Sequence, residues 1–461
     1  MLQQTTIQWD TDLIRRYDLA GPRYTSYPTA LQFNDTPDSV QTLSKAISAR
    51  DSRKPLSLYL HIPFCAHVCY YCGCNKVVTK DRSRAEPYLQ TLLKEIKLRS
   101  AELGSDVQVD QLHWGGGTPT FIDDEQTARL MQALKEAFKL RDDDQGDYAI
   151  EIDPREMTPG RLKLLRELGF NRISIGVQDV NEAVQIKVNR VQSLEMTTDL
   201  LKEARELGFR SINVDLIYGL PLQTEESFAE TLDRILELRP DRLSVFNYAH
   251  LPERFKPQRR INADELPDAL TKLAIHHQSI EKLTAAGYRN IGMDHFALPD
   301  DTLTQHQDEG TLHRNFQGYT THSQCDLIGL GVSSISQIGD YYLQNSPNIE
   351  RYAQDIETQG SALTKEYGLN EDDKIRRAVI TRLICDFQLD FADQSKALNI
   401  DFKAYFANEL KLLEPMAQDG LIHLNDEGMD VTAAGRLLIR RICMTFDAYI
   451  DHSEQRFSKI I

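Results

Sequence analysis

The chain has 461 residues, which at roughly 150 residues per domain suggests about three domain-sized units, or one large barrel with an appendage. Hydrophobic residues make up 41% and charged residues 26%, so a core can form and whole-chain disorder is excluded. Because 53 Lys and Arg face 69 Asp and Glu, the net charge is −16, and we expect no nucleic acid or anionic lipid as a general partner.

The sequence carries no sign of export or of membrane insertion. No apolar run approaches the ~18 residues that a membrane helix needs, and MLQQTTIQWDTDLIRRYD lacks the pattern of a signal peptide. We therefore expect a cytoplasmic protein without a membrane span. The seven cysteines are an odd number, which argues against a disulfide framework. Four of them fall within residues 65–74, and the scattered Cys325, Cys385 and Cys443 are expected to be small buried hydrophobes.

Strands alternate with helices over the first half of the chain. A period of 3.6 residues predicts helices over 85–103 and 124–140, and residues typical of helix starts occur at Asp123 and Thr224. Short apolar runs predict strands over 56–63, 108–117, 148–154, 172–178, 211–220 and 242–251. Six β–α units in succession predict a parallel sheet, either a barrel or an open doubly wound sheet.

Polar side chains occur in or at the ends of these strands, where a solely structural strand would be apolar. In a barrel, polar residues near the carboxyl ends of strands usually line the active site. Loop backbone alone can satisfy any one of them, but the pattern recurs on several strands and so favours a site. The residues are Glu151, Asp153, Gln178, Asp215, Asn247 and Tyr248.

The pattern loosens after residue 251. The segment 251–260 is expected to be a loop, 266–286 a helix, and NIGMDHFA a further strand, and from about residue 360 onward the chain is mostly helical in character. Near the end, two short apolar stretches flank a D-E-G turn and precede a helix, which resembles the wing of a winged-helix unit. A packing domain that binds no nucleic acid is the alternative, and the acidic charge favours it.

The cysteine cluster HIPFCAHVCYYCGC follows the first predicted strand directly. Cys65, Cys69 and Cys72 have the spacing C-x3-C-x2-C, and thiolates bind zinc or iron–sulfur clusters. Structural zinc usually takes paired knuckles separated by a longer stretch, and no second C-x2-C pair follows here. An iron–sulfur cluster with one iron left free for a substrate or cofactor fits this crowding better. A zinc-stabilised binding protein remains the alternative from another class.

The motif and its position resemble the radical S-adenosylmethionine (SAM) superfamily. Tyr71 supplies the aromatic residue before the third cysteine, and the glycine turn WGGGTP at 114–119 follows the second strand. The resemblance implies an α/β fold: a partial (β/α)6 TIM-like barrel with its extension at 53–360, an amino-terminal segment and lid at 1–52, and a mainly helical carboxyl-terminal domain at 361–461. It also implies one 4Fe–4S cluster held by Cys65, Cys69 and Cys72.

Further segments narrow the family. GPRYTSYPTA, the final CGC of the cysteine motif, GVQD, NVDLIYGLP, FNYAHLP and HRNFQGYTT resemble the bacterial oxygen-independent coproporphyrinogen III oxidases, from about Trp9 to the carboxyl terminus. The resemblance implies an enzyme of heme biosynthesis that converts two propionates of coproporphyrinogen III into vinyl groups and cleaves SAM to methionine and 5′-deoxyadenosine. It implies an electron donor and an electron acceptor that the sequence does not identify, and we expect a monomer.

The resemblance also assigns residues to two SAM molecules. The first SAM is expected to contact Tyr59, Tyr71, Gly116, Glu151 and Ile335. The second is expected to contact Gly117, Thr118, Gln178, Arg190, Asp215 and Ala249. The residue chemistry agrees, since Asp215 and Gln178 suit ribose hydroxyls or an ammonium group and Arg190 suits a carboxylate. An arginine such as Arg190 considered alone is more often a surface residue.

Four residues are candidates for catalysis or substrate contact. Cys74 is either a thiol that serves the reaction or a loop residue packed near the cluster. Gln317, Arg23 and Arg314 are expected to contact the tetra-anionic substrate, which needs local positive charge inside an acidic protein. A heme chaperone of the same superfamily is the main alternative function. Such chaperones tend to lack the GPRYTSYP and NFQGYTT segments, and both are present here.

Overall fold

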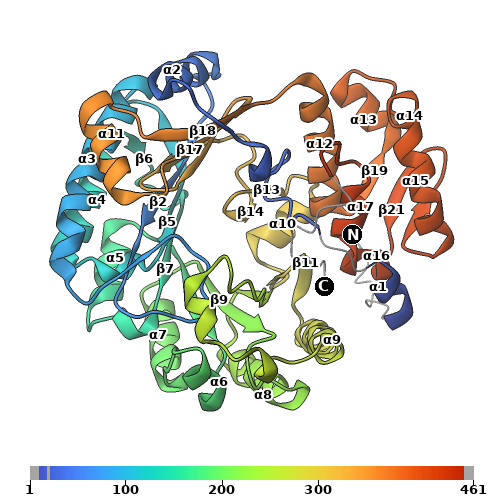
Figure 1. Cartoon of the computed structure of the whole chain (residues 1–461), viewed down its shortest axis with the longest axis horizontal. Coiled ribbons are helices and arrows are strands. Elements are labelled where there is room, and N and C mark those ends of the chain that lie inside the picture. The colour runs from blue at the N-terminus through green and yellow to red at the C-terminus, as the bar shows by residue number, and fades with distance from the viewer. Residues whose placement is uncertain (1–9, 18–20, 451–461) are drawn as a thin grey trace. The chain divides into compact units, whose positions relative to one another are not determined.

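The computed structural model of the chain (Figure 1) describes residues 10–17 and 21–450. The chain folds as two compact units. The barrel unit comprises Phe33–Lys272 and Gln324–Gly368, and the helical unit comprises the described residues of 1–32, 273–323 and 369–461. The domain boundaries expected after residues 52 and 360 stay a prediction. In the ranges just given, no helix combines the length and apolarity that a membrane span requires.

Parallel strands form the centre of the barrel unit. Each pairs with the next one along the chain, in the order β2 (Leu56–Ile62), β5 (Gln108–Gly116), β7 (Asp147–Ile152), β8 (Arg172–Gln178), β9 (Ser211–Tyr218) and β10 (Arg242–Asn247). All six strands predicted from the sequence are confirmed, and so is their parallel arrangement. Because they are parallel, their carboxyl ends meet at one edge, where the polar residues were expected.

Further strands extend this sheet beyond β2, and the sequence analysis did not predict them. A seventh parallel strand, β15 (Asp326–Leu330), pairs with β2 and places Gly329 opposite Tyr59. Antiparallel neighbours follow in the order β16 (Ile335–Ile338), β17 (Tyr341–Asn345), β18 (Leu363–Gly368) and β1 (Asn34–Asp35). The short strand β6 (Lys139–Leu140) pairs with β5 in the same sheet, whereas β3 (Phe64–Cys65) and β4 (Val77–Val78) form a separate two-stranded sheet.

Helices follow the strands and lie along their outer side (Figure 1). They are α2 (Ser39–Ala49), α3 (Ala85–Leu103), α4 (Asp124–Ala137), α5 (Arg161–Leu168), α6 (Glu182–Lys187), α7 (Leu194–Glu206), α8 (Glu225–Leu238) and α11 (Ile349–Gln359). Both expected helix starts are confirmed. Asp123 and Thr224 each accept a hydrogen bond from the backbone of the third helical residue and close a capping box.

Short 3-10 turns complete the described elements of the barrel unit. They are η2 (Arg82–Arg84), η3 (Pro119–Phe121), η4 (Pro154–Glu156), η5 (Lys256–Arg260) and η6 (Ala263–Glu265). The loop expected at 251–260 therefore contains one turn of 3-10 helix. Between sheet and helices the core is closely packed: Trp114 of β5 is fully buried and meets Phe170 edge to face, with 5.1 Å between the ring centroids.

The helical unit combines two hairpins, a three-stranded sheet and short helices. Its elements are α1 (Thr11–Tyr17), η1 (Ala30–Gln32), most of α9 (Ala269–Ala285), β11 (Arg289–Gly292), β12 (His295–Ala297), α10 (Thr302–Asp308), β13 (His313–Asn315), β14 (Gly318–Thr320), α12 (Glu371–Asp386), β19 (Gln388–Asp390), α13 (Phe391–Leu398), α14 (Phe402–Tyr405), α15 (Ala407–Gln418), β20 (Ile422–Leu424), β21 (Gly428–Val431), α16 (Ala433–Leu437) and α17 (Ile439–Met444). The expected hairpin around the D-E-G turn is β20–β21, and helices follow it as predicted.

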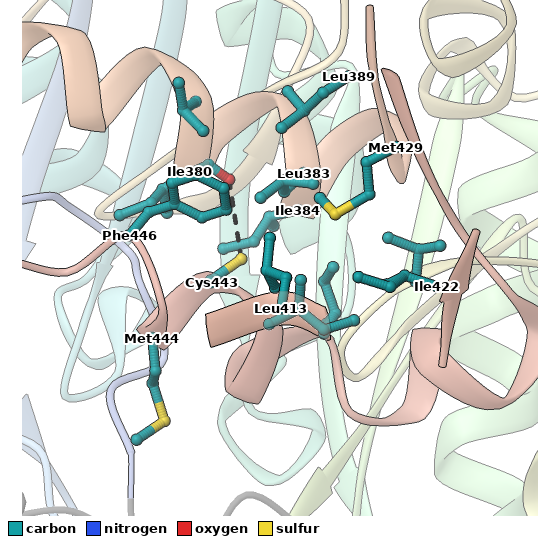
Figure 2. Packing of buried hydrophobic residues seen from close by; sticks show 14 of the residues in the cluster. Ile380, Leu383, Ile384, Leu389, Leu413, Ile422, Met429, Cys443, Met444 and Phe446 are labelled. Carbon is teal, nitrogen blue, oxygen red and sulfur yellow. Dashed lines mark hydrogen bonds between the residues drawn. The ribbon is translucent and has the colours of Figure 1, made fainter. Parts of the chain in front are cut away.

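Figure 2 shows the core of the helical unit around Cys443. Its thiol lies 4.0 Å from the carbonyl oxygen of Ile380, among side chains of α12, α15 and the β20–β21 hairpin. Cys443 and Cys385 are both fully buried, as expected for cysteines that act as small hydrophobes. The same expectation is wrong for Cys325, which is only partly buried. All seven cysteines of the chain are free thiols.

The segment GPRYTSYP contributes to the same core. Tyr24 and Tyr27 are 4% and 2% exposed, the Tyr24 hydroxyl donates to Asp447, and the Tyr27 hydroxyl accepts from the backbone of Ala448. These tyrosines therefore stabilise the helical unit. The expected lid includes residues 1–9 and 18–20, which lie outside the described residues.

Candidate functional site

One pocket opens at the carboxyl ends of β5, β7, β8 and β9, and the loop after β2 forms its mouth. The volume of the cavity is about 180 Å³. Thirteen of the residues expected in the site line it: Cys65, Cys69, Tyr71, Cys72, Cys74, Gly116, Gly117, Thr118, Glu151, Asp153, Gln178, Arg190 and Asp215. The fold therefore brings together residues from six separate segments of the chain.

The cluster loop, residues 65–74, is held in place mainly by its backbone. The amide of Tyr70 donates to the carbonyl of Val188 at 2.9 Å, and the Asn189 side chain donates to the carbonyl of Val68 at 2.8 Å. The amide of Thr79 donates to the carbonyl of Cys65 at 2.9 Å. The segment that follows α6 therefore fixes the middle of the loop, and the chain after the loop fixes its beginning.

Each of the three motif sulfurs receives a hydrogen-bond donor. The Thr118 hydroxyl lies 3.5 Å from Cys65 Sγ, and the backbone amide of Cys74 lies 3.5 Å from Cys72 Sγ. Cys69 Sγ receives two guanidinium groups, Arg190 at 3.5 Å and Arg155 at 3.6 Å. Donors of this kind stabilise thiolates, which are the form of cysteine that binds metal. The donor set therefore fits an iron–sulfur cluster with three cysteine ligands.

The thiols differ in their electrostatic surroundings. Burial raises the pKa of Cys65 to about 11, against a smaller lowering by the Thr118 hydrogen bond. Hydrogen bonding from Cys74 lowers the pKa of Cys72, and Lys76 lowers it further. The Lys76 ammonium also donates to the carbonyl of Cys72 at 3.1 Å, so it brings positive charge to this end of the loop.

Arg190 is a buried residue, which excludes the interpretation of a surface arginine. It is 6% exposed, lies 3.1 Å from Asp153, and donates to the carbonyl of Gly176 at 2.5 Å. Asp153 also pairs with Arg155 at 2.7 Å. Burial alone would raise the pKa of Asp153, but Arg190 and Arg155 together lower it to about 2, so the carboxylate is charged.

The glycine turn after β5 needs glycine for steric reasons. A Cβ on Gly117 would lie 2.8 Å from the backbone oxygen of Phe64, and its amide donates to the carbonyl of Ile62 at 2.9 Å. Gly116 has a φ of +119°, and a Cβ there would lie 2.8 Å from the His61 ring. The turn therefore lies directly against the strand and loop that carry Cys65, and its backbone faces the pocket.

Glu151 connects this turn with a row of aromatic residues. Its carboxylate accepts from the amide of Gly116 at 3.2 Å and lies 3.2 Å from His113 Nε2. The Tyr59 ring stacks on His113 at 5.9 Å between centroids, and the Tyr59 hydroxyl lies 3.1 Å from His61 Nδ1. Burial raises the pKa of Tyr59 and lowers that of His61, so both are neutral near pH 7.

Two polar residues on β8 and β9 face the pocket through unusual local structure. Gln178 ends β8 at a β-bulge with a φ of +70°, which turns its side chain back over Gly176. Asp215 accepts hydrogen bonds from Ser174 at 2.7 Å and from Asn213 at 2.8 Å. Burial raises the pKa of Asp215, while these hydrogen bonds oppose the increase.

Eight expected residues do not line this pocket. Tyr59 stacks on His113 as described, Ile335 starts β16, and Ala249 lies in the loop after β10. Asn247 ends β10, and the Tyr248 hydroxyl lies 2.8 Å from His250 Nδ1. In the helical unit, Arg23 pairs with Asp294 at 2.7 Å. Arg314 is 8% exposed and stacks on Tyr319 at 4.7 Å, and its Nε and Nη1 have no partner among the described residues. The Gln317 amide nitrogen is buried and equally without a partner there.

Sequence reasoning missed two groups that position the site. Arg155 lies only two residues after Asp153, but its contact with Cys69 bridges segments that are far apart in the chain. Gln258 is 2% exposed, and its amide nitrogen donates to the carbonyls of Tyr71 at 2.9 Å and Ala249 at 3.2 Å. A glutamine within a loop rich in Arg and Lys carried no signal that would have identified it.

Comparison with known proteins is consistent with this geometry. The model of the radical SAM superfamily matches residues 59–235, and that of the HemN C-terminal domain matches residues 369–438. The oxygen-independent coproporphyrinogen III oxidase of Pseudomonas aeruginosa is 57% identical over 460 residues, which cover 99% of both chains. The chain belongs to this family. The enzyme of the same name from Escherichia coli is 53% identical over 457 residues, again covering 99% of both chains.

A solved structure agrees over the whole fold. The coproporphyrinogen III oxidase HemN from Escherichia coli, described as a radical SAM enzyme, has a TM-score of 0.92 and 51% identity, and covers 97% of this chain and 100% of its own. The expected family, enzyme class and radical SAM type of α/β fold are thus confirmed. Membership of the radical SAM superfamily implies a 4Fe–4S cluster and SAM.

Proposed function

We propose that this chain catalyses the reaction of its family, the oxygen-independent oxidation of coproporphyrinogen III to protoporphyrinogen IX in heme biosynthesis. The observation that carries the proposal is the set of three motif thiols, each with its own donor, around a pocket lined by a glycine turn. The cluster and SAM, when bound, supply a radical that abstracts a hydrogen atom. The chain's own residues hold these groups, orient the substrate and exclude water.

The proposed cluster ligands are Cys65, Cys69 and Cys72, for one 4Fe–4S cluster per chain. Changing any one of them to Ser is expected to abolish the brown colour and SAM cleavage, because three thiolates are needed to hold three irons. The matched control is Cys325→Ser, since this partly buried thiol lies outside the pocket. A motif variant that keeps the cluster spectrum and full activity would contradict the ligand assignment.

The first SAM is proposed to lie against Gly116 and Glu151, with Tyr71 near the cluster and with Tyr59 and Ile335 as further contacts. The Glu151 carboxylate beside the glycine turn suits the amino group of SAM, since a carboxylate accepts hydrogen bonds from ammonium. His113 Nε2 lies 3.2 Å from the Glu151 carboxylate, and the Tyr59 ring stacks on His113.

The second SAM is proposed to use the neighbouring strand ends. Its contacts are Gly117, Thr118, Gln178, Arg190, Asp215 and Ala249. Asp215 and Gln178 offer acceptors for hydroxyl or ammonium groups, whereas Arg190 offers a buried cation for a carboxylate. Equilibrium dialysis with labelled SAM tests the count, since a stoichiometry of one per chain would contradict it.

The four propionates of the substrate need cationic partners. We place Arg314 and Gln317 in this role because their buried donors lack partners among the described residues, and an unpaired buried guanidinium is costly unless a ligand anion binds it. Arg23 is the third candidate, although its pair with Asp294 must then open or be shared. Cys74 is exposed next to Cys72, where a thiol that serves the reaction must lie.

The decisive experiment is an anaerobic assay of reconstituted protein with dithionite, SAM and coproporphyrinogen III. Protoporphyrin formed together with methionine and 5′-deoxyadenosine supports the proposal. SAM cleavage without protoporphyrin would move the function towards a heme chaperone, which the names of the relatives do not favour. Absence of SAM cleavage by protein with an intact cluster would contradict the radical mechanism altogether.

A further inference from the structure

A basic segment lies directly against the cluster loop. Residues 252–260, PERFKPQRR, are termed the basic loop, and they contain the four cations Arg254, Lys256, Arg259 and Arg260 against a single Glu253. The whole chain has a net charge of −16, so this concentration of positive charge departs from its surroundings. All four cations are exposed, and none of them forms an ion pair in the part of the chain that the structure describes.

Three separate contacts join the basic loop to the cluster loop. The ring of Phe255 covers Gly73, where an added Cβ would lie 3.0 Å from the ring. The guanidinium of Arg260 lies over the Tyr70 ring at 5.2 Å and 3.3 Å from its hydroxyl oxygen. Gln258 donates to the carbonyl of Tyr71, as described above. The positive charge is therefore fixed beside the proposed cluster ligands.

The cations of the basic loop face solvent rather than the pocket. None of the four lines it, whereas the buried Arg190 and Arg155 do. The guanidinium carbon of Arg254 lies over the Phe255 ring, 5.4 Å from its centroid. The Arg259 guanidinium donates to the carbonyl of Pro252 at 2.9 Å. These contacts hold the charges in place on the surface. Because the charges lie outside the pocket, they favour a macromolecular partner over a small anionic substrate bound in the pocket.

Exposed apolar side chains lie on the segment around Val188, which contacts the cluster loop. Ile186 is 57% exposed and Val191 is 54% exposed. They flank Val188, whose carbonyl accepts a hydrogen bond from the amide of Tyr70 in the cluster loop. Val188 also belongs to one group of buried hydrophobic side chains with Ile261, the residue that follows the basic loop. Apolar contacts surrounded by charge are the usual composition of a protein interface.

We propose that the basic loop docks an acidic protein that carries one electron at a time. This inference rests on the proposed function, because reductive cleavage of SAM consumes an electron that the chain cannot supply. The carrier is oxidised by one electron on this surface, and the docking itself makes and breaks no covalent bond. A local basic patch on an acidic protein selects a carrier with acidic residues around its redox group and orients it during approach.

The test measures binding first, with reconstituted full-length protein and a reduced acidic flavodoxin as the probe. The triple variant Arg254→Glu, Lys256→Glu, Arg259→Glu is expected to raise the dissociation constant ~10-fold or more at low salt. This difference should shrink as added salt screens the exposed charges. The matched control reverses Lys135, Lys163 and Lys202 on α4, α5 and α7, which changes the net charge equally away from the cluster loop.

The second readout compares two reductants. Dithionite is a small reductant that needs no docking surface, so the triple variant should keep wild-type product formation with dithionite and lose it with the flavodoxin. If the wild type forms no product with dithionite, the proposed function fails. The binding measurement then still tests by itself whether the basic loop docks the flavodoxin. The double variant Lys256→Gln, Arg259→Gln repeats the test with a smaller change of charge in case the triple variant does not fold.

Three results would overturn the proposal. The first is a triple variant that binds the flavodoxin as tightly as the wild type does. The second is a control variant that weakens binding equally, because only net charge would then matter. The third is a higher KM for coproporphyrinogen III in the dithionite assay, which would make the basic loop a substrate-binding element.

Discussion

Gln258 is a positioning residue whose removal has a calculable effect on the cluster loop. Its amide nitrogen donates to the carbonyls of Tyr71 and Ala249, and its amide oxygen accepts from the amide of Leu251 at 2.6 Å. Gln258→Met keeps the length of the side chain but removes all three hydrogen bonds. Each buried group that is left without a partner costs about 1–3 kcal/mol. We therefore expect a loss of about 2–5 kcal/mol in the free energy of unfolding.

The loss is expected to act on the cluster, because the carbonyl of Tyr71 lies between two proposed ligands. If the free energy of local opening of the loop falls by about 2 kcal/mol, the open population rises ~30-fold. The assay follows the visible absorbance of the reconstituted protein after addition of an iron chelator. We expect the cluster of Gln258→Met to be lost ~30-fold faster than that of the wild type.

Gln223 provides a matched control. It is 3% exposed, its amide oxygen accepts from the amide of Leu220 at 2.8 Å, and its amide nitrogen donates to the carbonyl of Ile217 at 2.9 Å and to Asp179. Gln223→Met should therefore lose as much stability as Gln258→Met but keep the cluster at the wild-type rate. Equal rates of cluster loss in the two variants would refute a specific positioning role.

Three more predictions address the turn, the pocket and pH. Gly116→Ala should lower the affinity for SAM and the absorbance of the cluster more than Gly169→Ala does. Both glycines have a positive φ, but only a Cβ on Gly116 meets neighbouring atoms, since nothing lies within 4 Å of a Cβ on Gly169. Equal effects of the two variants in SAM titrations would show that backbone strain alone matters. Asp215→Ala should lower turnover and leave the cluster spectrum intact, and wild-type kinetics would remove Asp215 from the site. Burial, together with the nearby charges of Arg382 and Arg377, lowers the pKa of His313 from 6.5 to about 4. Unfolding therefore takes up a proton between these values, and stability falls as pH decreases from 6.5 to 4. The melting temperature of His313→Gln should fall less over this range, and parallel curves would contradict the assignment.

The strands of the barrel were predictable because each is a continuous apolar run that a helix with clear end signals separates from the next. β15 and its antiparallel neighbours were not, since they are short and are stabilised by partners far away in the chain. Asp326 of β15 pairs with Leu56, about 270 residues earlier, and no local pattern encodes such a pairing. The carboxyl-terminal hairpin was predictable because its turn is local.

The site residues divide in the same way. Cys65, Gly116 and Gln178 were predictable because each stands at a fixed place in a motif or at the end of a strand. Gln258 and Arg155 act through contacts with segments roughly 190 and 90 residues away, and nothing in their own neighbourhood distinguishes them from surface residues. Residue type indicates which chemistry is possible, whereas the fold decides which polar side chain is buried.

The charges around Cys69 show why the cluster loop needs its ligand. Arg190 and Arg155 are largely buried, and they share the single carboxylate of Asp153. One carboxylate cannot neutralise two guanidinium groups, and a buried cation without an opposite charge is strongly unfavourable. The nearest group able to supply the missing negative charge is the thiol of Cys69, which both arginines contact. The two arginines therefore place positive charge against the Cys69 sulfur, and a thiolate that binds a metal cluster would bring the opposite charge to this position. Replacing Arg155 with Met is thus expected to weaken cluster retention even though Arg155 is no ligand.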